Sequence, residues 1–349
     1  MQYRTLGSTG VQVSSLCLGA MMFGTWGNAD HEDVAGIVRT ALDAGVNIID
    51  TADVYSGGES EVLVGRAIAG RRDEIVLATK VSSPMGPGRN ERGASRRWIV
   101  RACEASLRRL GTDHIDLYQV HRPDPATDLD ETLGALTDLV RAGKIRYAGS
   151  STFTPSAIVR AQWTAERRQR ERFVCEQPPY SLLARGIEAD VLPACEAHRM
   201  GVLAWSPLAG GWLSGRWHRD AVELSSHRTR TMPFRTTLSH YDLGIPANRA
   251  KLDAATELAG IAAEAGLTLI QLALAFVTTH PAVTAAIIGP RTAAHLRDQL
   301  AAADVVLDAE VLDRIDRVVA PGTDLNPEDT GYGAEILADP RRRRRAAAR

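Results

Sequence analysis

Apolar and polar residues alternate along the chain in blocks whose lengths suit β-strands and α-helices in turn. Short apolar runs of this kind are typical of buried strands: LCLGA (16–20), VNIID (46–50), EIVLATK (74–80), HIDLYQV (114–120), IRYAG (145–149), FVCEQ (173–177), GVLAW (201–205) and AAIIG (285–289). Stretches with apolar residues at helical spacing follow these runs: 31–44, 59–69, 95–109, 129–141, 155–170, 188–199, 268–279 and 291–302. Eight strand–helix units in sequence predict an α/β fold, a (β/α)8 TIM barrel.

Other segments complete this organisation. Residues 2–19 predict an N-terminal β-hairpin around Gly7–Gly10. A doubly wound sheet is the competing fold, but no G-x-G-x-x-G follows the first strand. We expect one barrel domain over residues 1–320 and a C-terminal extension over 321–349, a partly basic tail that ends in RRRRRAAAR.

Two long insertions are expected on the rim that carries the carboxyl ends of the strands. The first is the Gly/Pro-rich loop 84–94, and the second is 214–249. The second insertion brings aromatic and histidine side chains to this rim: Trp217, His218, Phe234, His240 and Tyr241. Both insertions are predicted to shape a substrate pocket.

Composition narrows the class of protein. Apolar content of 44%, charged content of 24% and a net charge of −1 are ordinary for a globular protein and favour neither nucleic acid nor a membrane surface as a partner. The four cysteines are far apart and form no CxxC pair, so we expect neither a disulfide framework nor a metal site. The N-terminal residues carry no apolar signal region. We expect a cytoplasmic protein, and these patterns specify no oligomeric state.

Four side chains of different chemistry stand at or just past the ends of three predicted strands. Asp50 closes VNIID, Tyr55 follows it, Lys80 closes EIVLATK, and His121 follows HIDLYQV. In a barrel of this kind, all four would point to the catalytic rim. Lys80 is informative because only three of the 41 basic residues are lysines, so an ammonium here indicates a specific need.

These four groups predict a proton donor next to a polarised carbonyl oxygen. A nearby ammonium favours the tyrosinate and is expected to lower the pKa of Tyr55 from its usual value of about 10. Asp50 would hold Lys80 charged and in place, and His121 would orient the carbonyl or relay the proton. The set lacks an electron source, and the simplest one is a nicotinamide cofactor that donates a hydride.

Several ordered motifs resemble those of the aldo-keto reductase superfamily, in the branch that includes bacterial proteins and the potassium-channel β subunits. They are NIIDTADVYSGGESEVLVGRAI, LATK, DLYQVHRPD, KIRYAGSSTF, WSPLAGG and IIGPRTAAHLRDQL. The resemblance covers about residues 1 to 320. It implies a barrel plugged by a hairpin, and NADPH-dependent reduction of aldehydes and ketones, with NADH as the less favoured cofactor.

The resemblance also implies roles for individual residues. Tyr55 is the expected general acid, Asp50 and Lys80 the pair that tunes it, and His121 the residue that orients the substrate carbonyl. The expected cofactor contacts are Ser151, Thr152, Gln177, Trp205, Ser206, Leu208, Gly210, Gly289, Arg291, Thr292, His295, Asp298 and Gln299. Arg291 suggests recognition of the 2′-phosphate. Trp26 and Trp98 are expected to supply apolar walls of the substrate pocket.

Each residue also has a structural explanation that needs no ligand. Asp50 could cap a helix, His121 could be a core histidine, Trp205 could pack the barrel, and Trp98 could pack an outer helix. Two other functions compete with the reductase: a cofactor-binding regulatory protein or redox sensor, and a cofactor-free lyase or isomerase that uses Lys80 as a Schiff-base amine.

Overall fold

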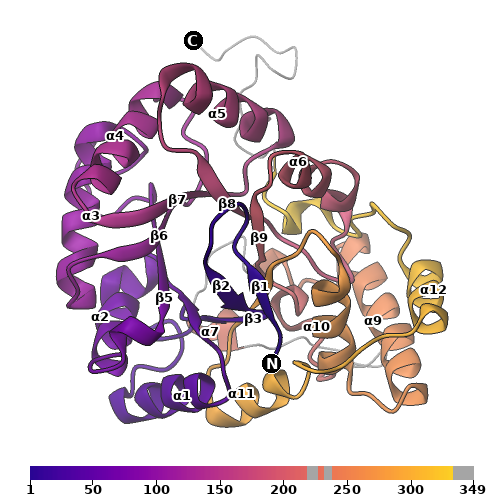
Figure 1. Cartoon of the computed structure of the whole chain (residues 1–349). Helices are drawn as coiled ribbons and strands as arrows, with labels where there is room; N and C mark the ends of the chain where they lie inside the picture. Colours follow the sequence, from indigo (N-terminus) through magenta and orange to yellow (C-terminus); the bar gives the residue numbers. More distant parts are fainter. Residues whose placement is uncertain (218–226, 232–237, 333–349) are drawn as a thin grey trace.

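The computed structural model describes residues 1–217, 227–231 and 238–332, and it confirms the (β/α)8 barrel with its N-terminal hairpin (Figure 1). The barrel strands are β3 (Leu16–Gly19), β4 (Ile48–Asp50), β5 (Val76–Val81), β6 (Ile115–Val120), β7 (Ile145–Ser151), β8 (Phe173–Gln177), β9 (Gly201–Ala204) and β10 (Ala285–Ile288). Neighbouring strands pair in parallel, and β10 closes the ring by pairing with both β9 and β3.

The eight expected helices are present, with ends shifted by a few residues. They are α1 (His31–Asp43), α2 (Glu59–Ala67), α3 (Arg96–Leu110), α4 (Leu129–Arg141), α5 (Pro155–Arg168), α6 (Val191–Ala197), α10 (Leu269–Thr279) and α11 (Ala293–Leu300). Side-chain caps fix several starts: Ser95 accepts from the Trp98 amide, and Thr154 accepts from the Ala157 amide. Within the described residues, three further α-helices were not predicted: α7 (His227–Thr231), α9 (Pro246–Glu264) and α12 (Ala309–Val318).

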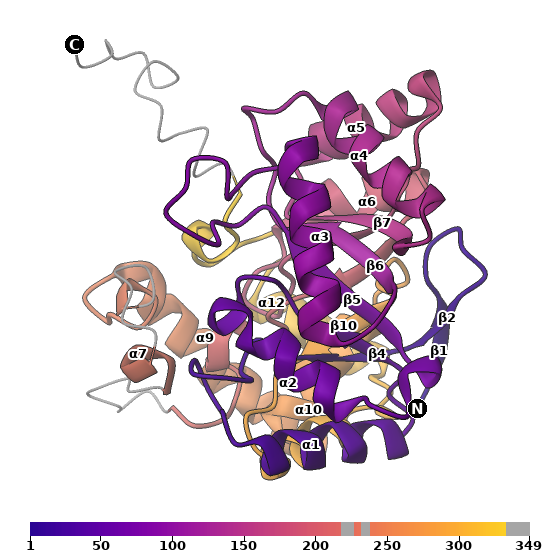
Figure 2. The same ribbon diagram turned by 90° about the vertical axis from the view of Figure 1, so that its left-hand side faces the viewer.

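The hairpin closes one end of the barrel. It consists of β1 (Tyr3–Thr5) and β2 (Gln12–Ser14), so it is shorter than the predicted span, because residues 16–19 already belong to the first barrel strand. Its Leu6 and Val13 are buried against Cys17, Leu117 and other residues that face the barrel interior. The hairpin and α7 lie at opposite ends of the barrel (Figure 2), so the rim that carries the expected site lies away from this plug.

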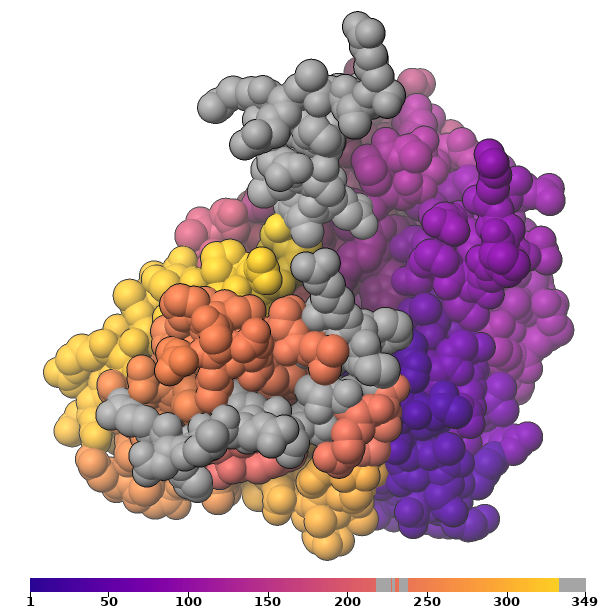
Figure 3. Space-filling model, turned by 180° about the vertical axis from the view of Figure 1, so that it is seen from behind, coloured from indigo at the N-terminus to yellow at the C-terminus, as the bar shows by residue number. Residues whose placement is uncertain are grey.

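The segment after β9 packs as an aromatic cluster on the rim. Trp212 stacks on Tyr241 with ring centroids 6.1 Å apart, and Trp217 meets both rings edge-on. Tyr241 Oη donates to the Gly210 carbonyl at 2.6 Å. Figure 3 shows this face, where the orange α9 and its flanking segments lie beside the indigo and purple N-terminal half. His218 and Phe234 of the insertion lie outside the described residues.

Residues 321–332 of the C-terminal extension pack against the same rim. The short helix η5 (Pro327–Asp329) brings Asp329 to Lys251 of α9, whose buried Nζ lies 2.7 Å from Oδ2 of that carboxylate. The Asp329 Oδ1 also lies 2.5 Å from His240 Nδ1. The Lys251 ammonium sits 4.6 Å from the centre of the Trp212 ring, so this cluster joins the extension to the aromatic segment.

Neither a metal-binding cluster nor a single membrane-spanning helix occurs among the described residues. They contain no group of three or more His, Cys, Asp or Glu side chains placed to hold a metal ion. None of their helices alone is both long and apolar enough to cross a membrane; α9 and α10 meet that test only as a pair, and a 92° bend separates them.

Candidate active site

Four side chains converge at the carboxyl ends of three neighbouring strands. Asp50 is the last residue of β4, Lys80 lies near the end of β5, and His121 directly follows β6. Tyr55 begins the short helix η1 (Tyr55–Gly58) after β4. Because β4, β5 and β6 are adjacent and parallel, their ends bring these residues to one rim of the barrel.

The lysine lies at the centre of the group. Lys80 is fully buried, and its Nζ donates to Asp50 Oδ2 at 2.5 Å and to the Thr51 carbonyl at 2.9 Å. The same ammonium lies 3.3 Å from Tyr55 Oη. The His121 ring meets the Tyr55 ring edge-on, with centroids 5.7 Å apart and an interplanar angle of 83°. One phenol therefore lies beside an ammonium and an imidazole.

Burial has the largest effect on the ionisation of these side chains. It raises the pKa of Tyr55 above its usual value, and Lys80 offsets this only in part. Burial alone would lower the pKa of Lys80, but Asp50 and Tyr55 together raise it. Burial, with the charges of Lys80 and Arg122, puts the pKa of His121 well below its usual value.

The expected lowering of the Tyr55 pKa is therefore wrong in sign. The ammonium does act in the expected direction, but removal of the phenol from water outweighs it. At neutral pH Tyr55 keeps its proton, Lys80 keeps its charge, and His121 is neutral. A neutral imidazole can donate one hydrogen bond and accept another, which suits it to orient a carbonyl oxygen.

Two glutamines extend the polar network around the barrel interior. Gln119 Nε2 and Gln177 Nε2 donate to Asp50 Oδ1 at 3.1 and 2.9 Å. Ser151 Oγ in turn donates to the Gln177 carbonyl at 2.8 Å. Strand register brings these side chains together, because Lys80 pairs with Gln119, and Ser151 pairs with Gln177. The network therefore runs without interruption from the lysine to the ends of β7 and β8.

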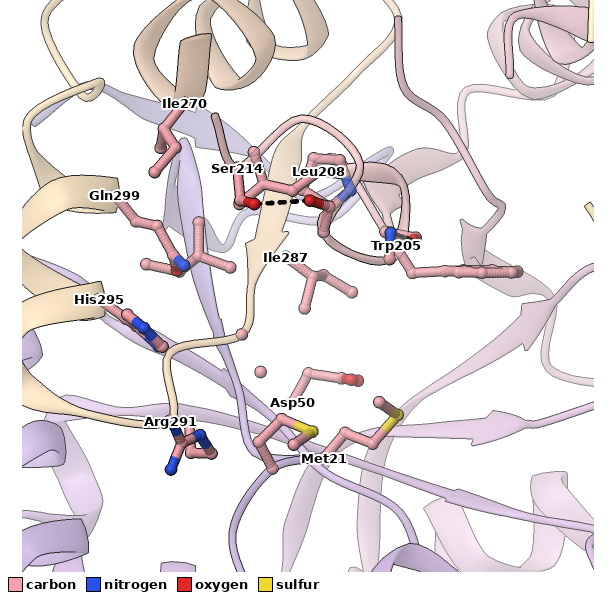
Figure 4. A pocket seen from close by; sticks show the side chains of 18 of the residues that line it. Met21, Asp50, Trp205, Leu208, Ser214, Ile270, Ile287, Arg291, His295 and Gln299 are labelled. Carbon is pink, nitrogen blue, oxygen red and sulfur yellow. Dashed lines mark hydrogen bonds between the residues drawn. The ribbon is translucent and has the colours of Figure 1, made fainter. Parts of the chain in front are cut away.

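A cavity of about 360 Å³ opens over this network. Most of the expected site residues line it: Asp50, Tyr55, His121, Ser151, Gln177, Trp205, Ser206, Leu208, Gly210, Gly289, Arg291, His295, Asp298 and Gln299. Figure 4 shows Trp205 on one side of Asp50 and Arg291, His295 and Gln299 on the other. Lys80 does not line it, because its side chain lies buried against Asp50.

Comparison with known proteins identifies this barrel. The Aldo/keto reductase family matches residues 15–320. The chain belongs to the aldo/keto reductase family. It is 42% identical over 323 residues to an uncharacterized oxidoreductase, YrpG, of Bacillus subtilis, with 89% of this chain and 94% of the relative covered. It is 36% identical to a probable voltage-gated potassium channel subunit beta of Arabidopsis thaliana (91% and 97% covered) and 32% identical to the Bacillus subtilis aldo-keto reductase YhdN (98% and 99%).

Membership of the aldo/keto reductase family makes this chain an NAD(P)H-dependent oxidoreductase that acts on small-molecule carbonyl compounds. The cavity offers polar atoms that such a dinucleotide could use. The buried Gln299 Oε1 and Trp205 Nε1 have no hydrogen-bond partner among the described residues. A side chain on Gly289 would project into open space, so its backbone can approach a ligand closely. These observations fit a nucleotide with amide, amine and phosphate groups.

The segment after β9 is a strained turn along one wall of the reductase cavity. Ser206 and Ala209 adopt left-handed backbone angles with φ of 59° and 48°, which non-glycine residues rarely do. Ser206 Oγ accepts from the Gly210 amide at 3.0 Å, and this contact closes the turn. Leu208 and Gly210 line the cavity from the same turn. Strained residues of this kind cluster at ligand sites.

Positive charge gathers at the other end of the reductase cavity. The pKa of His295 is lowered by burial and by Arg291 and Arg216. That of His227, on α7, is lowered by burial and by Arg291 and Arg230. Three guanidinium groups act on two neutral imidazoles at this end, where Asp298 supplies one opposing negative charge, so positive charge is in excess there and favours an anion.

Four expected contacts do not line the reductase cavity. Thr292 caps α11 by accepting from the His295 amide. Trp26 packs on Tyr55 with ring centroids 6.1 Å apart. Trp98 is buried in the core in the first turn of α3, which agrees with its structural explanation. Thr152 accepts a hydrogen bond from Arg122.

Sequence reasoning missed several residues of the site. Gln119 occupies an inward-facing position of β6, two residues after the buried Leu117 and two before His121, so alternation along a strand could have indicated it. Arg122, Arg216 and His227 also line the cavity. The last two fall in the insertion that was expected to shape the pocket, but nothing in its composition distinguishes them from their neighbours.

Proposed function

We propose that this chain reduces aldehyde or ketone carbonyls to alcohols with NADPH, and that Tyr55 is the proton donor. One observation supports this most strongly: a protonated phenol lies 3.3 Å from a buried, carboxylate-paired ammonium at the wall of the cavity. In this proposal the site residues have the roles that the sequence suggested, with Asp50, Lys80, Tyr55 and His121 at the reacting end.

The chain's own groups would act as follows. When bound, the reduced nicotinamide supplies a hydride to the carbonyl carbon. His121, neutral at physiological pH, donates a hydrogen bond that orients the carbonyl oxygen. Tyr55 gives its proton to that oxygen as negative charge develops, and Lys80 stabilises the tyrosinate left behind. Asp50 holds the ammonium in place throughout.

In the same proposal the cofactor would lie along the cavity. Ser151 and Gln177 would bind the nicotinamide carboxamide, Trp205 would stack on the ring, and the turn of Ser206, Leu208 and Gly210 would bind the pyrophosphate. Arg291, with Gly289, His295, Asp298 and Gln299, would bind the adenosine end. A bound 2′-phosphate at the cationic end would favour NADPH over NADH.

Replacement of Tyr55 by Phe tests the catalytic assignment. Phe keeps the ring against Trp26 but removes the proton donor, so kcat should fall by about 100- to 10,000-fold. The Kd of NADPH should change little. The assay follows NADPH absorbance with p-nitrobenzaldehyde, and binding is measured by quenching of protein fluorescence. A Phe variant that keeps the wild-type kcat would contradict the assignment.

Replacement of Arg291 by Ala tests the choice of cofactor. Loss of a charge-assisted contact to the 2′-phosphate should raise the KM for NADPH by about 10- to 100-fold. The KM for NADH should change far less, because NADH lacks that phosphate. Arg297 of α11, which does not line the cavity, offers a matched control: Arg297→Ala should leave both constants unchanged. Equal increases for the two cofactors in Arg291→Ala would remove the argument for NADPH.

Similarity to the Arabidopsis thaliana channel subunit favours a second candidate function, a cofactor-binding regulatory protein with little turnover. The two candidates differ in a simple measurement on purified protein. An enzyme oxidises NADPH when aldehydes or ketones are added. A regulatory protein binds NADPH tightly and shows no turnover across a panel of carbonyl compounds.

A further inference from the structure

Glu176 of β8 is a buried carboxylate that the catalytic group does not use. It is fully buried, and it lies next to Gln177 in the sequence. Because side chains alternate along a strand, Gln177 faces the barrel interior and Glu176 faces the helices outside. Its partner in register on β7 is Ser150, whose side chain faces the same way. Figure 1 shows β7 and β8 side by side beneath α5.

The carboxylate holds both ends of a two-residue segment. Glu176 Oε2 accepts from Ser150 Oγ at 2.5 Å, and Oε1 accepts from the Phe153 amide at 3.0 Å. Between these anchors lie Ser151 and Thr152, which we refer to as the carboxamide clamp. Ser151 lines the cavity.

The clamp has a backbone geometry that needs support. Thr152 has φ of 56°, in the left-handed region, which is a genuine outlier for a β-branched residue and costs about 1–3 kcal/mol. Its amide donates to the Gln177 carbonyl at 3.2 Å, and its hydroxyl contacts Arg122. The strained conformation of Thr152 is therefore held by its own hydrogen bonds and by the bonds of Glu176 to Ser150 and Phe153 on either side of the clamp.

We propose that Glu176 is a positioning residue, which fixes the carboxamide clamp in the geometry that binds the nicotinamide end of the cofactor. This inference rests on the proposed cofactor site. Glu176 itself touches neither cofactor nor substrate, because it faces away from the cavity and acts through Ser150, Phe153 and the clamp between them. Without it, the Phe153 amide loses its acceptor, and Thr152 relaxes toward an ordinary backbone angle.

The groups around Glu176 make its hydrogen bonds more important than its charge. Burial raises the pKa of Glu176 to about 7. Glu176 interacts electrostatically with four titratable or charged groups: Arg122, Cys175, Cys195 and Tyr332. A protonated carboxyl can still accept from the Phe153 amide on one oxygen and donate to the Ser150 hydroxyl with the other. A glutamine could make the same two contacts.

The experiment compares two ligands in four proteins. NADPH carries the nicotinamide, whereas adenosine 2′,5′-bisphosphate carries only the adenosine end, so the ratio of their Kd values isolates the clamp. Calorimetric titration is done with wild type, Glu176→Ala, Glu176→Gln and, as a matched control, Glu166→Ala on the exposed face of α5. For Glu176→Ala we expect NADPH to bind about tenfold more weakly, as loss of one or two hydrogen bonds implies. The bisphosphate should bind as in wild type.

Each outcome decides the proposal. Glu176→Gln and Glu166→Ala should bind both ligands as wild type does. Equal weakening of both ligands in Glu176→Ala, unchanged NADPH binding, or a Gln variant as weak as the Ala variant would each overturn it. If Glu176→Ala does not fold, Ser150→Ala, which removes one anchor, should weaken NADPH selectively by a smaller factor. Wild-type protein that binds neither ligand would instead refute the proposed cofactor site.

Discussion

Replacement of Lys80 by Met measures the electrostatic effect on which the proposed chemistry depends. At 3.3 Å and an effective dielectric constant of about 20, a unit charge stabilises a tyrosinate by about 5 kcal/mol. Asp50, 2.5 Å from the ammonium, cancels part of this field. The phenol proton is also only partly transferred at the transition state. We therefore expect about half of the effect, ~2–3 kcal/mol, which lowers kcat by about 100-fold.

The assay should separate chemistry from binding and from folding. Single-turnover stopped-flow with saturating NADPH and p-nitrobenzaldehyde reports the hydride-transfer step, and thermal denaturation shows whether the variant folds. Because Lys80→Met leaves Asp50 buried without its partner, it should lose about 3–5 kcal/mol of stability. The double variant Asp50→Asn/Lys80→Met removes both charges and should recover part of that stability, but it should not recover the rate.

Lys80→Arg distinguishes a compact ammonium from any positive charge. The guanidinium is a wide planar fork, and a fully buried site built around one Nζ does not accommodate it. The kcat of Lys80→Arg should be nearly as low as that of Lys80→Met. A folded Met variant whose kcat stays within about threefold of wild type, which is less than 1 kcal/mol, would refute the reasoning. A fully active Arg variant would show that only the charge matters.

Two further predictions concern pH and stability. The pKa of Tyr55 is raised, and that of His121 lies well below about 6.5. The kcat for reduction should therefore be constant from about pH 6 to 8 and fall only as the pH rises through the pKa of Tyr55, above about 10. A loss of kcat on acidification near neutral pH would contradict this. Asp329→Ala should lower the free energy of unfolding in urea by about 3–5 kcal/mol, because it leaves Lys251 buried and unpaired; Asp329→Leu/Lys251→Met should recover most of the loss.

Much of the fold followed from the periodicity of the sequence, because each strand–helix unit buries its own apolar face. Helix α9 was missed because it begins within the insertion, where polar residues up to 249 indicated a loop. Helix α12 was missed although Val311 and Ile315 lie on one buried face, because the eight repeated units left it without a strand to follow. The two helices contact each other although they are distant in the sequence, and Arg314 of α12 pairs with Glu264 of α9.

The convergence of Asp50, Lys80 and His121 was predictable without coordinates, because strand ends in a barrel share a rim. The direction of the Tyr55 pKa shift was not predictable, because it depends on how completely the fold removes the phenol from water. The sequence shows that a lysine is near, but the degree of burial depends on residues such as Trp26, which reaches Tyr55 through a loop held by the Ser56 hydroxyl.

In the proposed mechanism, the raised pKa of Tyr55 suits the site to reduction at neutral pH. Reduction needs the phenol to hold a proton before the hydride arrives, and burial secures that state. Oxidation of an alcohol needs the tyrosinate, which would form only at high pH. Asp50 connects Lys80 to the proposed cofactor site, because its two oxygens accept from Lys80 and from Gln177. Hydrogen bonds therefore connect the clamp, through Gln177 and Asp50, to the ammonium beside Tyr55.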